Sequence, residues 1–251
     1  MFRFAGKVAG KDDLMMEEMQ RLTYEDTFCF LCHKGVRCFT ECCRDLDVVL
    51  TPYDIIRLKN GLGIGSDEFL AKYTGTHTGP NSGLPVVNLR MSKNAKQTCP
   101  FVTEHGCTVY NDRPGACRSY PIGRVAVKNE ETQKDEEFFL LVREPHCFGF
   151  EEQKEWKVKD WLKDQEIGTY NRMNDLLMEV ISQKNRAGKA SLNEQEQAIF
   201  YTACYDLDRF STLPHIKDLP ENCRIEPHTV EKDTELMQFA LKWISATLFG
   251  D

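Results

Sequence analysis

Hydrophobic positions in the second half of the chain recur at the spacing of amphipathic helices. Met173, Leu176, Leu177, Val180 and Ile181 follow the i, i+3, i+4 pattern closely. The same pattern predicts one helix before this segment and two after it, marked by these apolar groups: Val158, Trp161 and Leu162; Ile199, Ala203, Leu207 and Phe210; Leu236, Ala240, Trp243, Ile244 and Leu248. The four residues from Ser191 to Glu194 are typical of a capping box that opens the second of these three helices, and Gly250 follows the last one.

Helical patterns in the first half are shorter. Residues 12–24 are predicted to form an amphipathic helix. Thr51 has the side chain of an N-cap, a proline follows it in the first helical position, and Gly61 is the expected C-cap. Another short helix is expected to begin at Ser66 and to run through Tyr73.

Extended patterns separate these helices. Alternation over residues 46–50 predicts a short strand, and residues 84–91 predict another. Two further extended segments, 125–127 and 138–142, are expected to form a hairpin around the acidic tip Glu130–Glu137. Val109 and Tyr110 are expected to be extended, and residues 74–83, which contain His77, are expected to be an irregular mobile loop.

The change in pattern after Gly149 predicts an α+β protein. We expect a lead-in at residues 1–25, a cysteine-rich region with short strands at 26–149, and a mainly helical region at 150–251. The sequence contains no internal repeat.

Composition supports a globular protein and argues against a nucleic-acid partner. Of the 251 residues, 41% are hydrophobic and 28% are charged, which is typical of a chain that buries a core. The net charge of -7 lacks the basic excess that phosphate backbones attract.

The first 25 residues contain no apolar segment typical of a secretory signal, and no window is long and apolar enough for a transmembrane helix. We therefore expect a cytoplasmic protein with no membrane association. In that compartment, clustered thiols are expected to bind metal rather than to form disulfides.

The chain has eleven cysteines, and nine of them lie between residues 29 and 147. Thiolates are soft ligands that suit zinc, iron–sulfur clusters or Cu(I). The candidate metal ligands are Cys38, Cys42, Cys43, Cys99, Cys107 and Cys117, with Cys29, Cys32 and Cys147 as additional candidates. Cys204 has the spacing of a helix core residue, and Cys223 is given no role.

The number of candidate ligands exceeds what one tetrahedral ion can use. Four thiolates around one zinc are the simplest site, and a cluster held by four cysteines is the second solution. Adjacent Cys42 and Cys43 would face opposite sides of an extended backbone and serve different metals, whereas a turn or a helix start would let both contact one ion. The sequence thus favours two metals, or one cluster with spare thiols.

Several arginines lie beside the cysteines. Arg44, Arg113 and Arg118, together with Arg37, are candidates to offset the negative charge of thiolates around a metal. The alternative is that these arginines pair with carboxylates or lie on the surface. His33 and His146 are alternatives to a thiolate ligand, although a lone histidine is more often a surface residue.

These motifs resemble the YkgJ-like CxxCxxCC family, which is described as zinc- or iron-chelating. The resemblance covers about residues 28–123. It is carried by these strings: Cys38-x3-Cys42-Cys43, Leu50–Leu58, Glu68-Phe69-Leu70, Cys99-Pro100-Phe101, Gly106-Cys107-x-Val109-Tyr110 and Arg113-Pro114-x2-Cys117-Arg118-x-Tyr120-Pro121. The family's C-x2-C-x2-C-C spacing is stretched in this chain, so either Cys29 or Cys32 could fill the first ligand position.

Three functional hypotheses follow. The first is a metal-binding protein that holds zinc or iron through these thiolates. The second is an iron–sulfur enzyme that modifies a protein or small molecule, which the family's similarity to the flagellin lysine methylase FliB implies; His77, Tyr110, Arg113, Arg118 and Tyr120 would line its cleft. The third is a metal-free thiol-redox module that uses Cys42 with Cys43, or Cys29 with Cys32. A protein partner could bind the C-terminal helices, and the sequence leaves open whether the protein is an enzyme.

Overall fold

The computed structural model describes residues 20–128, 135–213 and 229–250. The chain forms two compact units, each assembled from separate segments. The first, which we call unit 1, comprises Met1–Asp47, Met91–Thr108 and Gly115–Gly168; the second, unit 2, comprises Val48–Arg90, Val109–Pro114 and Thr169–Asp251. Short antiparallel strands and a helical C-terminal region confirm the α+β class. Residues 26–149 contribute to both units, and the division at residues 25 and 149 stays a prediction.

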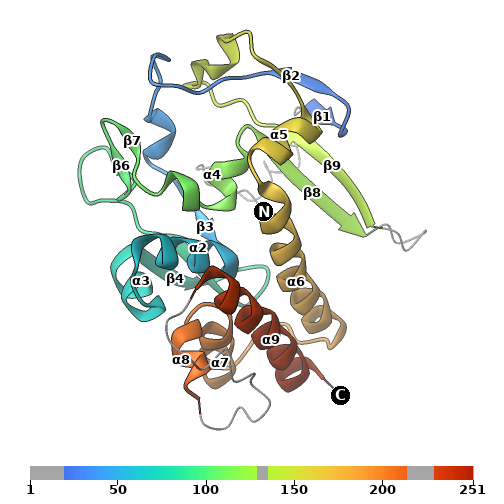
Figure 1. Cartoon of the computed structure of the whole chain (residues 1–251). Helices are drawn as coiled ribbons and strands as arrows, with labels where there is room; N and C mark the ends of the chain where they lie inside the picture. The colour runs from blue at the N-terminus through green and yellow to red at the C-terminus, as the bar shows by residue number, and fades with distance from the viewer. Residues whose placement is uncertain (1–19, 129–134, 214–228, 251) are drawn as a thin grey trace. The chain divides into compact units, whose positions relative to one another are not determined.

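Within its described residues, unit 1 contains three small antiparallel sheets. In the largest sheet, β1 (Gln20–Leu22) pairs with β9 (Asp135–Leu141), which pairs with β8 (Ile122–Lys128). The β8–β9 hairpin confirms the predicted one, with Ile122 opposite Leu141, and most of its acidic tip lies outside the described residues (Figure 1). The other two pairs are β2 (Thr27–Cys29) with β10 (Glu155–Lys157), and β6 (Val102–Thr103) with β7 (Gly106–Cys107).

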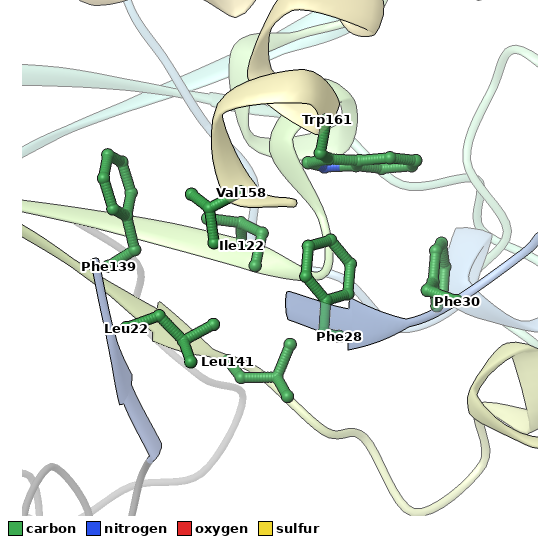
Figure 2. Close-up of a cluster of buried hydrophobic side chains, with 8 residues drawn as sticks. All are labelled: Leu22, Phe28, Phe30, Ile122, Phe139, Leu141, Val158 and Trp161. Atoms are coloured by element: carbon green, nitrogen blue, oxygen red, sulfur yellow. The ribbon is translucent and has the colours of Figure 1, made fainter. Parts of the chain in front are cut away.

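An aromatic core joins the sheet of unit 1 to α5 (Val158–Asp164). Figure 2 shows that Trp161 extends from this helix over Phe28. The rings of Phe28 and Phe30 meet that of Trp161 edge to face, at centroid distances of 6.0 and 5.6 Å. The indole N–H of Trp161 donates to the Ser119 carbonyl at 3.0 Å, so burial leaves no polar atom of this ring unsatisfied. The full cluster comprises Leu22, Phe28, Phe30, Ile122, Phe139, Leu141, Val158 and Trp161.

The helix predicted at residues 12–24 is wrong where the structure describes it. Gln20–Leu22 forms strand β1, and Leu22 is buried opposite Phe139 while Gln20 and Arg21 stay exposed. Hydrogen bonds to the exposed edge of β9 decide the conformation of so short a segment. Residues 12–19 lie outside the described residues.

Unit 2 combines a three-stranded sheet with helices. Strand β5 (Pro85–Leu89) lies between β3 (Val49–Leu50) and β4 (Thr74–Thr78), and all pairings are antiparallel. The helices are α2 (Pro52–Leu62), α3 (Ser66–Tyr73), α7 (Glu194–Cys204), α8 (Leu207–Ser211), α9 (Val230–Phe249) and α6 (Ile167–Arg186), whose first two residues belong to unit 1. These helices confirm the helical periodicities predicted for this part of the chain. The helix predicted through Ile199 and Phe210 is divided in two, because α7 ends at Cys204 and α8 follows as a separate short helix.

Two expectations about extended structure in unit 2 are wrong. Residues 74–78 form strand β4 instead of a loop, because alternating threonines favour the extended backbone and β5 offers a partner from Thr74↔Leu89 to Thr78↔Pro85. Tyr110–Asp112 forms a 3-10 turn, η2, in place of an extended segment. Arg57 stabilises this turn by donating from Nε and Nη2 to Asp112 at 2.9 and 2.7 Å.

The helix caps confirm some sequence signals and shift others. Thr51 and Asp54 form a complete capping box at α2, as predicted from the threonine, but the C-cap is Gly63 (φ 66°) instead of Gly61. A Cβ at Gly61 would come within 2.5 Å of the Asp112 carboxylate, so close packing explains that glycine. The capping box at α7 uses Asn193 and Glu196, two residues later than the predicted start.

A buried ionic network joins the helices of unit 2. Lys59, which is 2% exposed, contacts the carboxylates of Asp208 and Asp233 at 2.7 and 2.8 Å. Asn60 also donates to Asp233, and the Ser66 N–H donates to Asp208. The network ties α2 to α3, α8 and α9. In the described ranges, none of the helices combines the length and the apolar character needed to cross a membrane.

Candidate metal centre

All nine candidate cysteine ligands belong to unit 1. They lie on short elements and turns: Cys29 on β2, Cys32 and Cys38 in the following turns, and Cys42 and Cys43 in the 3-10 turn η1 (Glu41–Cys43). Cys99 precedes β6, Cys107 is in β7, Cys117 is in α4 (Gly115–Ser119), and Cys147 precedes the 3-10 turn η3 (Phe148–Glu151). Sequence neighbours and distant segments therefore meet within a single unit.

One group of thiols forms where the chain after β2 meets the turn at η3. The Leu31 N–H donates to the Gly149 carbonyl at 3.0 Å, which brings Cys32 beside Cys147. The Phe148 N–H donates to Cys38 Sγ at 3.1 Å. Cys32 interacts electrostatically with Cys42, Cys38 and Cys147, and this set of four is named group A.

A second group forms around the backbone pairing of η1 with the segment before β6. The Cys99 N–H donates to the Cys43 carbonyl at 2.8 Å, beside a bridge between Arg44 and Thr98. Cys43 interacts with Cys117 and Cys99, and Cys99 interacts with Cys107. The set Cys43, Cys99, Cys107 and Cys117 is named group B.

The hairpin β6–β7 holds Cys107 in group B. Gly106 adopts φ +112°, a conformation that favours glycine, and a Cβ there would lie 3.2 Å from the Phe39 ring. The Thr108 N–H and hydroxyl both donate to the Phe101 carbonyl, at 2.8 and 3.0 Å. These contacts fix the short strand that carries the thiol.

Cys42 and Cys43 connect the two groups. The preceding Thr40 has φ 68°, which is uncommon for a β-branched residue, and turns the chain into η1. The turn places the two thiols in hydrogen-bonding contact, so the Cys43 S–H donates to Cys42 and lowers the pKa of Cys42 to about 7. The same bond, with burial and the neighbouring thiols, raises the pKa of Cys43. Apart from each other, Cys42 interacts with Cys32, Cys147 and Cys99, and Cys43 interacts with Cys117 and Cys99. The turn therefore lets the two sulfurs serve either one ion or two.

Backbone N–H groups surround several sulfurs. The N–H groups of Phe101 and Val102 lower the pKa of the Cys99 thiol, although burial raises it by more. At Cys147, burial again raises the pKa, while the Tyr120 hydroxyl and the Gly149 N–H lower it. Such donors favour the thiolate over the thiol and orient it for a metal.

Two of the chain's cysteines stand apart from these groups. Cys29 is exposed on β2, and it is not among the thiols that act on Cys32, Cys43, Cys99 or Cys147. Cys204 is fully buried in α7, where burial raises the pKa of its thiol. Its position agrees with the core role predicted from helical spacing, and Cys223 lies outside the described residues.

The donor set fits a soft metal, but the thiols do not converge on a point. Over the described residues, no three His, Cys, Asp or Glu side chains are close enough to hold one ion together. Eight sulfurs are nevertheless gathered on turns that carry N–H donors, and side-chain rotation is the smallest change that would bring ligands together. Groups A and B are therefore the residues available to hold zinc or iron, and bound metal would supply the cross-links between these turns.

The candidate arginines have different surroundings. Arg118 is 4% exposed and donates from Nη1 to the Gln165 carbonyl at 2.8 Å. Arg44 pairs with Glu41 at 2.7 Å, and Arg37 pairs with Glu151 while its guanidinium covers the Phe148 ring. Arg113 belongs to unit 2, where it stacks on Tyr110 at 3.8 Å. Carboxylate pairing thus applies to Arg37 and Arg44 and also, at 3.7 Å from Glu166, to Arg118, which is buried in the unit that carries the thiols.

The two candidate histidines lie at the surface. His33 is exposed, with Nε2 3.5 Å from Glu152 and Nδ1 accepting the Gly35 N–H, and His146 is exposed beside Cys147. The cleft residues of the enzyme hypothesis are divided, with His77, Tyr110 and Arg113 in unit 2 and Arg118 and Tyr120 in unit 1.

Tyr120 contacts the thiols of unit 1 directly. Its hydroxyl is buried beside Cys147, and burial, followed by this contact, raises the pKa of Tyr120.

Sequence reasoning did not identify the backbone donors around η3. The hydrogen bond from the Phe148 N–H to Cys38 Sγ cannot be recognised from residue types, since any residue except proline could supply the N–H group. Gly149 does carry one: a Cβ there would lie 2.7 Å from the Phe30 ring, so close approach of the two chains requires a glycine. Gly149, two residues after Cys147, is thus the one sequence feature that could have indicated this close approach.

The comparison with protein families found one match. Residues 31–148 match the model of the CxxCxxCC family, described as "putative zinc- or iron-chelating domain". The comparisons with curated proteins and with solved structures found no match. The matched segment begins just before Cys32 and ends just after Cys147, so it contains every thiol of groups A and B. The family description supports metal binding, and the match over residues 31–148 confirms the resemblance carried by the cysteine motifs.

Proposed function

We propose that the protein binds two zinc or iron ions through the thiolates of group A and group B. Group A supplies Cys32, Cys38, Cys42 and Cys147 to one ion, and group B supplies Cys43, Cys99, Cys107 and Cys117 to the other. Cys29, the remaining candidate, is left out. The observation that carries the proposal is the gathering of eight thiols from distant segments within unit 1, with a backbone N–H bonded to Cys38 Sγ at 3.1 Å.

Charge supports the thiolate assignment. Four thiolates on a divalent ion leave a net charge of about -2, which a low-dielectric site tolerates only with compensating donors. Group A has the Phe148 N–H, the Gly149 N–H and the Tyr120 hydroxyl, and group B has the N–H groups of Phe101 and Val102. Buried Arg118 lies in the same unit, and because it also pairs with Glu166 at 3.7 Å, its charge offsets that of the thiolates only in part.

The proposed sites are closed, because each group offers four thiolates and a tetrahedral ion uses all of them. A closed site cross-links the chain and leaves no coordination position for a substrate. A structural role thus agrees with the geometry better than the modifying-enzyme hypothesis does. An iron–sulfur cluster in one group with spare thiols in the other remains the second arrangement, and sulfide content separates the two.

The test is to purify the protein without oxygen and to measure metal and acid-labile sulfide per chain. Two equivalents of zinc or iron without sulfide support the proposal. Cys38→Ser and Cys43→Ser are each expected to lose about one equivalent, since each removes one ligand from one group.

Cys29→Ser is the matched control, because it makes the same change at an exposed thiol of the same unit, and it should keep both metals. Far-UV circular dichroism identifies variants that have lost their fold, and metal is counted only in folded protein. Folded wild-type protein without metal, or equal metal loss in Cys29→Ser and Cys38→Ser, would contradict the proposal.

A further inference from the structure

Unit 2 contains a pocket that takes no part in the cysteine site. It lies between strand β4 and helices α7 and α8 and has a volume of about 350 Å³. This volume is at the small end of the range for ligand-binding pockets. The lining residues are Thr76, His77, Thr78, Pro85, Gln197, Ala198, Tyr201, Thr202 and Arg209.

The polar side chains of this lining are donors or cations, and none of them is a carboxylate. Arg209 is exposed, and across the described ranges its guanidinium forms no ion pair. An arginine that lines a pocket without a carboxylate partner has its fork of N–H donors available for an anion. The Asp206 carboxylate, which is not among the lining residues, interacts electrostatically with Tyr201. It is buried and accepts a hydrogen bond from the Ser66 hydroxyl at 2.7 Å.

Strand β4 directs hydroxyl groups toward α7. Thr76 hydrogen-bonds with the Tyr201 hydroxyl, and Thr78 Oγ1 lies 3.4 Å from Gln197 Oε1. Residues two apart on a strand share a face, so both threonines face this helix. Their O–H donors are used within the wall, on Tyr201 and Gln197, so they make the wall polar without adding charge.

The backbone of β4 adds further donors. The strand is an edge of its sheet over the described residues, and its bonded register is shown by Gly79 N–H to Leu84 O and by Arg90 N–H to Tyr73 O. In an antiparallel pair the bonded positions alternate, so the N–H groups of Thr76 and Thr78 point away from β5. Free N–H groups at a strand edge bind oxygens of a ligand.

An apolar wall completes the pocket. Pro85, Ala198 and the ring of Tyr201 line it beside the polar groups. We propose that this pocket binds a small organic anion, with its carboxylate or phosphate at Arg209 and its apolar body against Pro85, Ala198 and Tyr201. The inference is independent of metal binding, since every residue it uses belongs to unit 2.

The test titrates the full-length, metal-loaded protein with four probes at millimolar concentration: benzoate, phenyl phosphate, inorganic phosphate and neutral benzamide. Chemical shifts in an NMR titration report both affinity and location. Benzoate or phenyl phosphate is expected to bind and to shift resonances of β4 and α7, and benzamide is expected to bind at least tenfold more weakly, because it lacks the charge.

Variants decide whether Arg209 carries the interaction. Arg209→Gln is expected to weaken binding of the organic anion about tenfold or more. Arg172→Gln is the matched control, because Arg172 is another exposed arginine of unit 2 outside the pocket, and affinity should not change.

Three results would overturn the proposal. They are the absence of binding by either organic anion, equal affinity in Arg209→Gln and wild type, and inorganic phosphate binding as tightly as phenyl phosphate, which would leave the apolar wall without a role. The relative affinities of benzoate and phenyl phosphate show which anionic group the pocket prefers. A folded Arg209→Gln protein, verified by its unchanged spectrum outside the pocket, keeps the test valid.

Discussion

Neighbouring residues of the same type acquire opposite properties in this protein. Cys42 and Cys43 are adjacent, yet the pKa of Cys42 falls to about 7 while that of Cys43 rises. The hydrogen bond between them stabilises the thiolate form of Cys42. It makes ionisation of Cys43 less favourable, because Cys43 would lose the proton that it donates. Exposure alone does not set reactivity, since Cys32 is exposed as well and its pKa rises to about 11 through desolvation and nearby thiols.

Cys42 is expected to be the fast-reacting thiol of the metal-free protein. At pH 7 the thiolate fraction of Cys42 exceeds that of Cys32 by several powers of ten. A thiolate of lower pKa is also a weaker nucleophile, so the difference between the two reaction rates is smaller than the difference between the thiolate fractions. We expect iodoacetamide to alkylate Cys42 about 100-fold faster than Cys32. The Cys42 rate should rise as pH increases through about 7 and then level off, as measured by peptide mass spectrometry.

Buried Cys204 is the internal reference for this experiment, and it should stay unmodified while the protein is folded. Equal rates for Cys42 and Cys32 would show that the Cys43 bond does not lower the pKa in solution.

Lys59 is the second residue whose role depends on its surroundings. Its ammonium lies between Asp208 and Asp233, and Asp233 is fully buried. Lys59→Met is expected to destabilise unit 2 by about 3–5 kcal/mol, because it leaves buried carboxylates without their cation. Urea unfolding followed by circular dichroism measures the loss.

The control is Lys159→Met, which removes a cation from an exposed pair with Glu25 in unit 1. An exposed pair contributes little to stability, so no measurable loss is expected. Similar losses in the two variants would mean that the Lys59 network is hydrated in solution.

At the scale of elements, end signals define helices better than they define strands in this chain. The side chains of Thr51 and Asp54 accept hydrogen bonds from each other's backbone N–H groups at 3.2 and 2.8 Å. Both residue types are typical of a helix start and can be recognised in the sequence. Strand β4 has no end signal of this kind. Its threonines favour an extended backbone, but glycine and threonine are also frequent in turns, so the pairing with β5 decides its conformation. The same holds for β1, which exists through its bonds to β9.

The capping box of α2 gives a prediction for this helix. Thr51→Ala should destabilise unit 2 by about 1 kcal/mol, since the Asp54 N–H loses its acceptor. The double variant with Asp54→Ala should lose less than the sum of the single variants, because the two side chains act as a unit. Thermal unfolding of all four proteins measures the coupling, and strict additivity would contradict the reciprocal cap.

At the scale of the whole molecule, the chain crosses between its two units several times. Residues 48–90 leave unit 1 after the first cysteine group and return before Cys99, so the thiols of group B come from both sides of an excursion through unit 2. Unit 1 also has its own aromatic core around Trp161. Cys147 of group A packs against this core, so bound metal and hydrophobic packing would stabilise the same unit together.

Metal removal should consequently loosen unit 1 without unfolding it completely. After chelation, we expect amide exchange to accelerate in the thiol-bearing segments 29–44, 97–108, 115–119 and 143–150, because bound metal would cross-link these segments. The β8–β9 hairpin should keep its protection through the core of Leu22, Phe139 and Leu141, and the helices of unit 2 should be unaffected. Mass spectrometry resolves these segments. Uniform loss of protection across both units, or no change in the thiol segments, would contradict this view.

The sequence by itself determined the soft-ligand character of the thiols, the resemblance to the CxxCxxCC family, the α+β class and most helices. These depend on residue type and local spacing, which any reader of the chain can see: thiols with short separations, apolar residues at helical periods and a threonine–proline start at α2. Tertiary structure decided which cysteines belong together, because group A joins Cys32 to Cys147 and group B joins Cys43 to Cys99 across long stretches of chain. It also decided that Thr76 and Arg209, far apart in sequence, line one pocket. Long-range pairing is set by backbone hydrogen bonds and packing, and these leave no periodic trace in the order of the residues.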